Sequence, residues 1–525
     1  MHTFELLLAL VAACVALAIL ARRLAVPPAV ALVLGGMALA FVPGLPQVEL
    51  SPELALVLFL PPLLQLSAYH TDWPAFRSNL RPILLLAVGA VFFTAAAVAV
   101  VAKLLVPDLP WWAAVALGAI IAPPDAVAAS AVLKQVRLPK RIVTVLEGES
   151  LINDAASLVL YRFAVGAVAA GGASYGQGAL LFFGASLGGA LVGWLAGRAA
   201  MWVFAQIEDT LLDITVSLLA GFGAYLAAER LHASGVLAAV ACGLVLGRQQ
   251  HSEFSARTRL DAAAVWGFVE FLLTALVFML IGLQLRGIVE RLGRYNLADL
   301  ALLGAAVSLA LILSRFVWVF PSTWLPRALS PSLRARDPMP PWSHAAVLSW
   351  AGMRGVVSLA AALALPTQFP GRDLIVFLAF CAILATLVLQ GTTLGLVIRR
   401  LGVEEGEAAV PQPEAAQARA EVATAALAAV QAHLGESSAS EHTEAATELV
   451  QEYEVRAERA SVETQGTEDK AEHLAAQQRL RLVAIEAGRA KLGEHRDGVD
   501  TGAHRTLGEE LDLEEQQVRR GRSKD

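Results

Sequence analysis

The chain has 525 residues, of which 57% are hydrophobic and only 16% are charged, and its formal net charge is −6. Soluble globular proteins are about 45–50% apolar and about 25% charged. The composition therefore excludes a single water-soluble globule and indicates a polytopic membrane protein. Residues 401–525 contain 26 acidic and 14 basic side chains, whereas residues 1–400 contain 20 and 26. We therefore predict a transmembrane domain (1–400) followed by an acidic, Ala-rich tail (401–525).

Apolar segments long enough to cross about 30 Å of hydrocarbon recur throughout the first domain. They predict an all-α polytopic membrane protein with about thirteen transmembrane helices. The expected spans are 4–20, 26–43, 51–69, 82–103, 111–133, 142–166, 178–200, 209–228, 234–248, 264–286, 297–320, 343–366 and 373–398. In the tail, runs such as Pro413–Leu434 favour helix by propensity, which predicts a solvated helical appendage or a regulatory or dimer-stabilising module.

Basic residues mark alternate loops between these spans, which predicts that those loops are cytoplasmic. With an odd number of spans, the N-terminus is expected outside and the tail in the cytoplasm. Arg22 and Arg23 follow the first apolar run instead of preceding it, so that run is expected to be a retained span and not a signal peptide. Three arginines, Arg286, Arg291 and Arg294, fall on the opposite side from the rest.

The fifth expected span contains a double proline followed by a carboxylate, Ile121-Ala-Pro-Pro-Asp125. Pro123 and Pro124 have no N–H, so two carbonyls of the preceding turn lose their helical partners. Such carbonyls are tolerated in a membrane only beside a cavity or other protein groups. Asp125 comes directly after the break, and an ionisable group costs about 2.5–3.5 kcal/mol at a span centre. A structural kink is the simpler interpretation, but the carboxylate favours a cation or proton site.

The sixth expected span has a polar face. Ser150 and Asp154 are four residues apart, as are Glu149 and Asn153, so all four side chains share one side of a helix. Carboxylate and amide oxygens are hard ligands that suit Na⁺ or a similar ion. An interhelical hydrogen-bond cluster explains Ser150 and Asn153 equally well, but it does not explain Asp154.

The twelfth expected span contains Arg354 between Gly352 and Gly355, and the two glycines permit local unwinding. An arginine at this depth requires an anion. Glu149 is the natural candidate, although Asp125 and Asp154 compete for that role and spacing alone does not choose among them. Two broken spans at these positions fit the transporter plan in which inverted repeats place crossing broken helices near the membrane midplane.

Several segments resemble the sodium/proton exchangers of the cation:proton antiporter superfamily, of the bacterial monovalent cation:proton antiporter-1 type. The most specific are Leu138-Pro-Lys-Arg-Ile-Val143 and Glu147-Gly-Glu-Ser-Leu-Ile-Asn-Asp-Ala-Ala156. The further matches, in chain order, are Phe59-Leu-Pro-Pro-Leu-Leu64, Ser234-Gly-Val-Leu-Ala238, Gly243-Leu-Val-Leu-Gly247, Phe271-Leu-Leu273, Phe278-Met-Leu-Ile-Gly-Leu-Gln284, Met353-Arg-Gly-Val-Val-Ser-Leu359 and Gln390-Gly-Thr-Thr393. The resemblance covers about residues 1–400.

The resemblance implies roles for the polar residues. Asp154 would alternately hold a proton or the cation, with Asn153 beside it. Asp125 would lie at the crossing of the broken helices, and Ser150 would complete the site. Glu149 and Arg354 would form a structural ion pair. The family is homodimeric and moves a six-helix core against a dimer domain.

Two departures from the family pattern bear on ion selectivity. Many relatives have Thr where this chain has Pro124, which removes a hydroxyl ligand. Many also have an acidic residue shortly after the Pro-Pro of the third span, where this chain has Gln65 and Leu66.

Together these features predict a secondary antiporter in the plasma membrane that exchanges Na⁺ or Li⁺ for H⁺ in pH and sodium homeostasis. The resemblance also implies the stoichiometry: this chain has Asn153 and Asp154 where some relatives have two aspartates, which suggests one proton per cation and electroneutral exchange. A K⁺/H⁺ antiporter is the alternative. An intramembrane hydrolase is a remote alternative, because the sequence lacks an H-E-x-x-H motif, a G-x-G-D dyad and a Ser/His pair.

We expect no enzymatic activity, no cofactor, no resident metal and no nucleic-acid partner. Membrane lipid and a second copy of the chain are the expected partners. The three cysteines are spaced unlike a zinc site.

Overall fold

A computed structural model describes residues 2–24, 26–43, 52–125, 128–129, 138–172, 175–207, 209–254, 256–292 and 296–403, together with short stretches of 421–487. The chain divides into two compact units, Met1–Glu404 and Glu405–Asp525. All regular structure in the described part of the first unit is helical. Its helices are α1 (His2–Arg23), α2 (Pro28–Ala40), α3 (Pro52–Tyr69), α4 (Trp73–Ser78), α5 (Leu80–Leu84), the π-helix η1 (Leu85–Ala90), α6 (Val91–Leu105), α7 (Trp111–Ile121), α9 (Lys140–Ala169), α10 (Tyr175–Phe204), α11 (Thr210–Arg230), α12 (Gly235–Glu253), α13 (Ala256–Leu283), α14 (Leu285–Arg291), α15 (Leu297–Leu329), α16 (Pro331–Arg336), α17 (Trp342–Trp350), α18 (Val356–Leu363), α19 (Arg372–Ala385), the π-helix η2 (Thr386–Gln390) and α20 (Gly391–Arg400).

The helices of the first unit have the length and apolar character of membrane spans. Seven stretches of the described chain are long and apolar enough to cross a membrane: Leu80–Leu105, Lys140–Ala169, Phe182–Phe204, Thr210–Arg230, Thr258–Arg291, Ala298–Leu329 and Arg372–Arg400. Four shorter apolar helices are Pro28–Ala40, Leu56–Tyr69, Trp111–Ile121 and Gly235–Gln249. The predicted all-α, multi-pass membrane fold is therefore confirmed, while the count of thirteen crossings stays a prediction.

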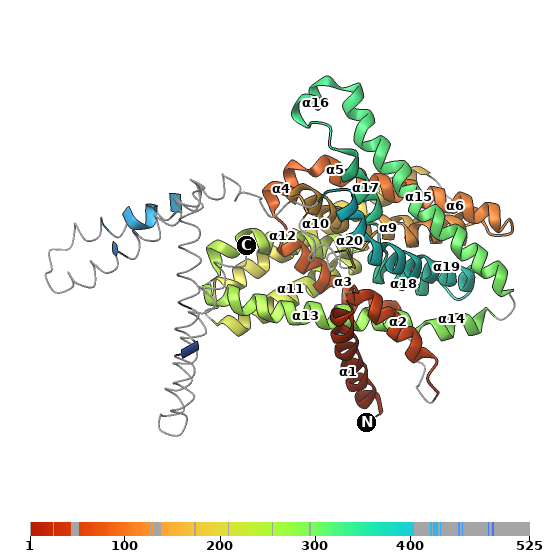
Figure 1. Ribbon diagram of the computed structural model, residues 1–525, viewed down its shortest axis with the longest axis horizontal. Coiled ribbons are helices and arrows are strands. Elements are labelled where there is room, and N and C mark those ends of the chain that lie inside the picture. Colours follow the sequence, from red (N-terminus) through yellow and green to blue (C-terminus); the bar gives the residue numbers. More distant parts are fainter. Residues whose placement is uncertain are drawn as a thin grey trace. The chain divides into compact units, whose positions relative to one another are not determined.

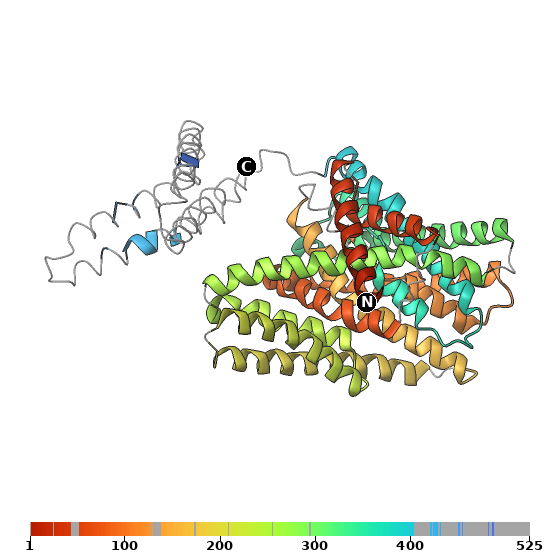
Figure 2. The ribbon, with the colours of Figure 1, turned by 90° about the horizontal axis from the view of Figure 1, so that it is seen from below.

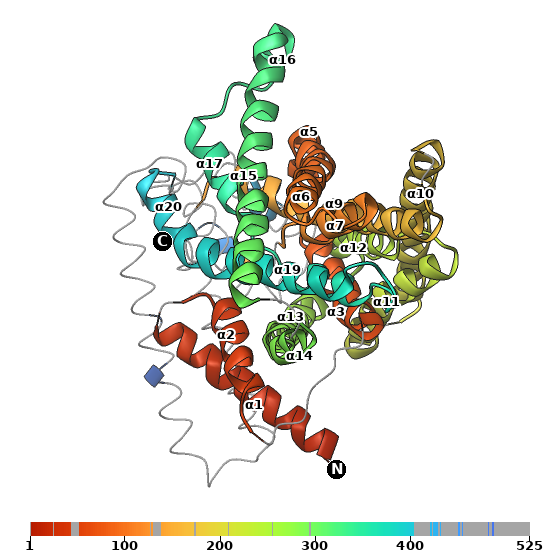
Figure 3. The same ribbon diagram turned by 90° about the vertical axis from the view of Figure 1, so that its right-hand side faces the viewer.

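Most contacts among the helices of the first unit, which are labelled in Figure 1, fall within two groups. In one group, α10, α11 and α12 contact one another, α3 packs against α11 and α12, and α2 lies against α13 and α1. Figure 2 shows the long helices of this group running side by side. In the other group, α6 and α9 pack against α7, and α15 contacts α6, α17 and α19. Figure 3 shows α15 and α17 on the opposite side of the bundle from α10 and α11.

Small residues allow the closest helix contacts, as expected where lipid removes the hydrophobic drive for association. Gly36 and Gly282 bring α2 and α13 together. A Cβ added at Gly36 would lie 2.3 Å from the Met279 carbonyl oxygen, and one at Gly282 would lie 2.2 Å from the Val33 carbonyl oxygen. Each such contact excludes any larger residue, so the glycine stripes fix how closely these helices approach.

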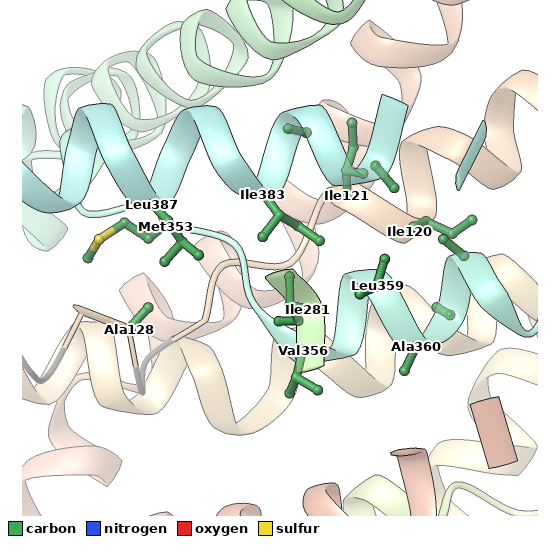
Figure 4. Close-up of a cluster of buried hydrophobic side chains, with 14 of the residues drawn as sticks. Ile120, Ile121, Ala128, Ile281, Met353, Val356, Leu359, Ala360, Ile383 and Leu387 are labelled. Carbon is green, nitrogen blue, oxygen red and sulfur yellow. The ribbon is translucent and has the colours of Figure 1, made fainter. Parts of the chain in front are cut away.

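The two predicted helix breaks are present and cross each other. α7 ends at Ile121, before the double proline, and α17 and α18 are separated by the non-helical segment 351–355. The Asp125 backbone N–H donates to the Met353 carbonyl at 2.7 Å, which joins the two breaks directly. Apolar side chains such as Val356 and Leu387 surround the crossing (Figure 4). Beyond Asp125, only residues 128–129 of the expected fifth span lie within the described residues before 138.

Candidate functional site

Side chains of α9 bind two carbonyls at the break that follows α7, and the double proline leaves one of them without its helical partner. Because Pro123 has no N–H, the Ala119 carbonyl cannot be bonded within its own helix, and the Ser157 hydroxyl donates to it at 2.7 Å. The Asn153 amide donates to the Pro124 carbonyl at 2.6 Å. Both side chains are fully buried. The α9 polar face therefore supports the break in α7, and this is the hydrogen-bond cluster that sequence reasoning offered as one interpretation of Asn153.

Arg354 binds the same break from the other side. Its Nε donates to the Ile121 carbonyl at 2.7 Å and its Nη2 to the Ala122 carbonyl at 3.0 Å. Its Nη1 donates to the Gly352 carbonyl. Its backbone N–H donates to the Thr386 hydroxyl at 3.1 Å. The guanidinium, which is 2% exposed, thus joins the two broken segments by carbonyl contacts.

The predicted Glu149–Arg354 ion pair is wrong, because Glu149 pairs with Arg315 of α15. The guanidinium makes two hydrogen bonds to the carboxylate, at 2.6 and 2.7 Å, and both residues are at most 3% exposed. The Nε of Arg315 also donates to the Leu348 carbonyl at 3.0 Å. The reason is geometric. The guanidinium nitrogens of Arg354 already donate to backbone carbonyls of both breaks. The guanidinium of Arg315 is oriented toward Glu149, and its planar arrangement of N–H donors matches the two oxygens of a carboxylate.

Asp125 lies at the crossing itself. A Cβ added to Gly355 would lie 1.6 Å from its Oδ2, so the carboxylate rests against the backbone of the second break. The side chain is half-buried. Gly355 is therefore required for space, since any side chain at this position would displace the carboxylate.

Asp154 is a buried acidic residue of α9 whose carboxylate takes part in none of the hydrogen bonds and ion pairs described above. It is 6% exposed, and none of the described side chains donates to its carboxylate. It lies close enough to Asp125 for the two carboxylates to repel each other. The half-buried Ser150 lies one turn earlier on α9. Two neighbouring carboxylates inside a membrane domain require a bound proton or cation, because the ionised pair is costly there.

Three further polar residues of this region are not among those predicted from the sequence: Arg315, Ser157 and Thr386. Arg315 lies inside the expected span 297–320, so the rule that intramembrane charges are informative would have identified it. Ser157 lies four residues after Asn153 and extends the same polar face of α9, so its spacing would have predicted it.

Gln65 stands where many members of the family have an acidic residue. Its amide donates to the Ser217 carbonyl of α11 at 2.6 Å.

We expect Gly355→Ala to impair the site strongly, because the new methyl group would occupy the space of the Asp125 carboxylate. The measurement is cation binding to the purified protein by isothermal titration calorimetry. Gly166→Ala is the matched control, since a Cβ at Gly166 meets no atom within 4 Å. Equal cation affinity in the two variants would contradict the placement of Asp125 in the site.

Comparisons with protein families, with individual proteins and with solved structures all point to the same kind of protein. Residues 8–400 match the family described as sodium/hydrogen exchanger, transmembrane. An uncharacterized Na⁺/H⁺ exchanger of Mycobacterium tuberculosis is 35% identical over 527 residues, covering 98% of this chain and 95% of its own. A sodium, potassium, lithium and rubidium/H⁺ antiporter of Bacillus subtilis is 33% identical, covering 70% of this chain and 57% of its own. The solved sodium proton antiporter MjNhaP1 of Methanocaldococcus jannaschii has a similar fold, with a TM-score of 0.62 at 18% identity over 78% of this chain and 99% of its own.

Proposed function

Since the chain belongs to the sodium/hydrogen exchanger family, we propose that it is a secondary active antiporter that exchanges Na⁺ or Li⁺ for H⁺ across the plasma membrane, in pH and sodium homeostasis. The observation that carries this proposal is the buried Asp154 carboxylate, which lies beside Asp125 at the crossing of two broken helices. The relatives named as Na⁺/H⁺ exchangers and antiporters support the choice of ion.

The chemistry follows from competition for one carboxylate. A proton on Asp154 removes the negative charge that attracts the cation, and a bound cation favours release of the proton. Asp125, Ser150 and Asn153 contribute oxygens of the hard type that alkali cations prefer. Asn153 carries no charge, so within the Asn153–Asp154 pair one proton leaves for each cation that binds. Exchange is then electroneutral, and alternating access exposes the loaded site to one side at a time.

Structural residues keep the site in place while its occupant changes. The Glu149–Arg315 pair and the Arg354 carbonyl contacts hold α9, α15, α17 and the break after α7 together. We infer that these elements move as one body against the helices α1–α3 and α10–α13, in a homodimer whose copies meet through α1–α3 and α10–α13. The resemblance to the family supports this arrangement.

The arginines at one end of the domain support the proposed orientation. Arg81, Arg141 and Arg327 come from three of the predicted cytoplasmic loops, and all three contact Asp337. These loops therefore lie on the same side of the membrane domain. With the positive-inside rule, this side is the cytoplasm, the N-terminus is outside and the tail is inside.

The decisive experiment is transport in proteoliposomes with an internal acid load. We expect added Na⁺ or Li⁺ to release the proton gradient, measured by dequenching of a pH-sensitive dye. The initial rate should not change when valinomycin and K⁺ clamp the membrane potential, because no net charge moves. Equal or faster release by K⁺ would favour the K⁺/H⁺ alternative, which the name of the Bacillus relative also allows. Failure of every alkali cation would refute antiport.

A further inference from the structure

A cluster of three arginines surrounds one carboxylate at an end of the membrane domain, away from Asp154. Asp337, in the loop after α16, accepts from Arg141 at 2.6 Å and from Arg327 at 2.5 Å. Arg81 lies 3.7 Å from the same carboxylate. Burial acts to raise the pKa of Asp337, but the hydrogen bonds and charges of Arg141 and Arg327 outweigh it and lower that pKa below its usual range. The carboxylate is therefore ionised, and the cluster keeps a net charge of about +2 at neutral pH.

The donors of the three arginines are unequally used. Arg327 is only 5% exposed and directs all three nitrogens at oxygens of Asp337 and Thr323. Arg141 and Arg81 are different, because their side chains are 44% and 35% exposed and, among the described residues, Arg81 makes only the 3.7 Å contact. Each guanidinium carries five N–H donors. Both arginines therefore keep donors and charge for another anion.

A cavity of about 60 Å³ opens beside these guanidinium groups. This exceeds the roughly 10–15 Å³ that a single water molecule requires. Arg81, Arg141 and Arg327 line it together with polar groups of Ser322, Thr323 and His344. No acidic side chain of the described residues lines the cavity. The electrostatic potential inside it is accordingly positive.

The remaining walls of the cavity are aliphatic. They are formed by Pro82, Leu85, Leu86, Ile142, Val145, Val319, Pro340, Ala345 and Leu348. Arg81 and Arg141 lie at the first turns of α5 and α9, and Arg327 lies in the last turn of α15, so the polar end of the cavity is at the level of the helix ends. Basic pockets between transmembrane helices at this depth suit anionic headgroups, with apolar walls below for acyl carbons.

We propose that this pocket binds a phosphate group through Arg81 and Arg141, carried by an anionic phospholipid headgroup or present as free phosphate. The guanidinium fork matches phosphate oxygens bidentately, and Thr323 adds a hydroxyl donor. The bound anion neutralises the positive charge of the arginines that Asp337 does not balance. Its binding ties the first turns of α5 and α9 to α15. This proposal is independent of which cation the protein transports.

The test is thermal unfolding of the delipidated full-length protein in neutral detergent. The probes are phosphatidylglycerol, with phosphatidylcholine as the zwitterionic comparison, and inorganic phosphate, with chloride at equal ionic strength. We expect phosphatidylglycerol to raise the Tm in a saturable manner. In Arg81→Gln/Arg141→Gln, the apparent affinity should fall about tenfold or more, since two charge-assisted contacts are lost. Stabilisation by phosphatidylglycerol alone assigns the site to lipid, and equal saturable stabilisation by inorganic phosphate assigns it to the free anion.

The control variant is Arg77→Gln/Arg334→Gln, which removes the same charge from two exposed arginines that do not line the cavity. It should keep the wild-type affinity. If neither probe stabilises the protein, or if both double variants lose affinity equally, the pocket is not a phosphate site. Should the Arg81→Gln/Arg141→Gln protein fail to fold, Arg81→Gln alone retains both hydrogen bonds of Asp337 and still must weaken binding; unchanged affinity in it overturns the proposal.

Discussion

Asp154→Asn is expected to abolish cation-dependent proton release, leaving only the background rate of protein-free liposomes. The substitution keeps the size of the side chain but removes its charge and its proton. No hydrogen bond from a described side chain to the carboxylate is lost, so the fold should be retained. Thermal unfolding and size-exclusion chromatography check the fold, and proteoliposome dequenching measures the rate at matched reconstituted amounts.

The matched control for this variant is Asp299→Asn, because Asp299 is an exposed acidic residue in the first turn of α15. It should transport at the wild-type rate. Asp125→Asn provides a second comparison, since it removes the repulsion between the two carboxylates while Asp154 stays titratable. Normal cation-dependent proton release by Asp154→Asn would show that another group carries the exchanged proton.

Local chemistry made the helix breaks predictable from the sequence. A proline has no N–H and a glycine has no Cβ, so Pro123, Pro124 and Gly355 fix the position of each break without knowledge of the neighbouring helices. The polar face of α9 was also predictable without knowledge of the neighbouring helices, because residues four apart, such as Ser150 and Asp154, lie on one side of any helix.

Pairing across the bundle was not predictable, because it depends on how helices distant in sequence pack. Glu149 and Arg315 are 166 residues apart, and spacing contains no information about which arginine faces the carboxylate. Charge balance required an arginine, and Arg354 satisfied that requirement in the sequence as well as Arg315 did. Backbone carbonyls decided the outcome: they are acceptors in every residue, so a sequence does not reveal which of them a broken helix leaves for Arg354.

The Glu149–Arg315 pair also makes the largest stability prediction. We expect Arg315→Met to destabilise the protein by about 3–5 kcal/mol, because it leaves a buried carboxylate without its partner. The pair is at most 3% exposed, so water cannot replace the lost contact. The Arg162–Glu229 pair serves as the control. It has a similar 2.7 Å contact, but its side chains are 51% and 29% exposed. Arg162→Met should therefore cost no more than about 1 kcal/mol.

The double variant Glu149→Gln/Arg315→Met separates the ion pair from its individual members. It removes both charges, and replacing a buried pair by neutral groups is often close to neutral in stability. We expect it to recover part of the loss, but not all, because Arg354 lies close enough to interact with Glu149 and would lose that carboxylate. Thermal unfolding in detergent measures all four proteins. If Arg315→Met is as stable as Arg162→Met, the buried pair does not hold α9 against α15, and the carbonyl contacts of Arg354 must join the two halves of the site alone.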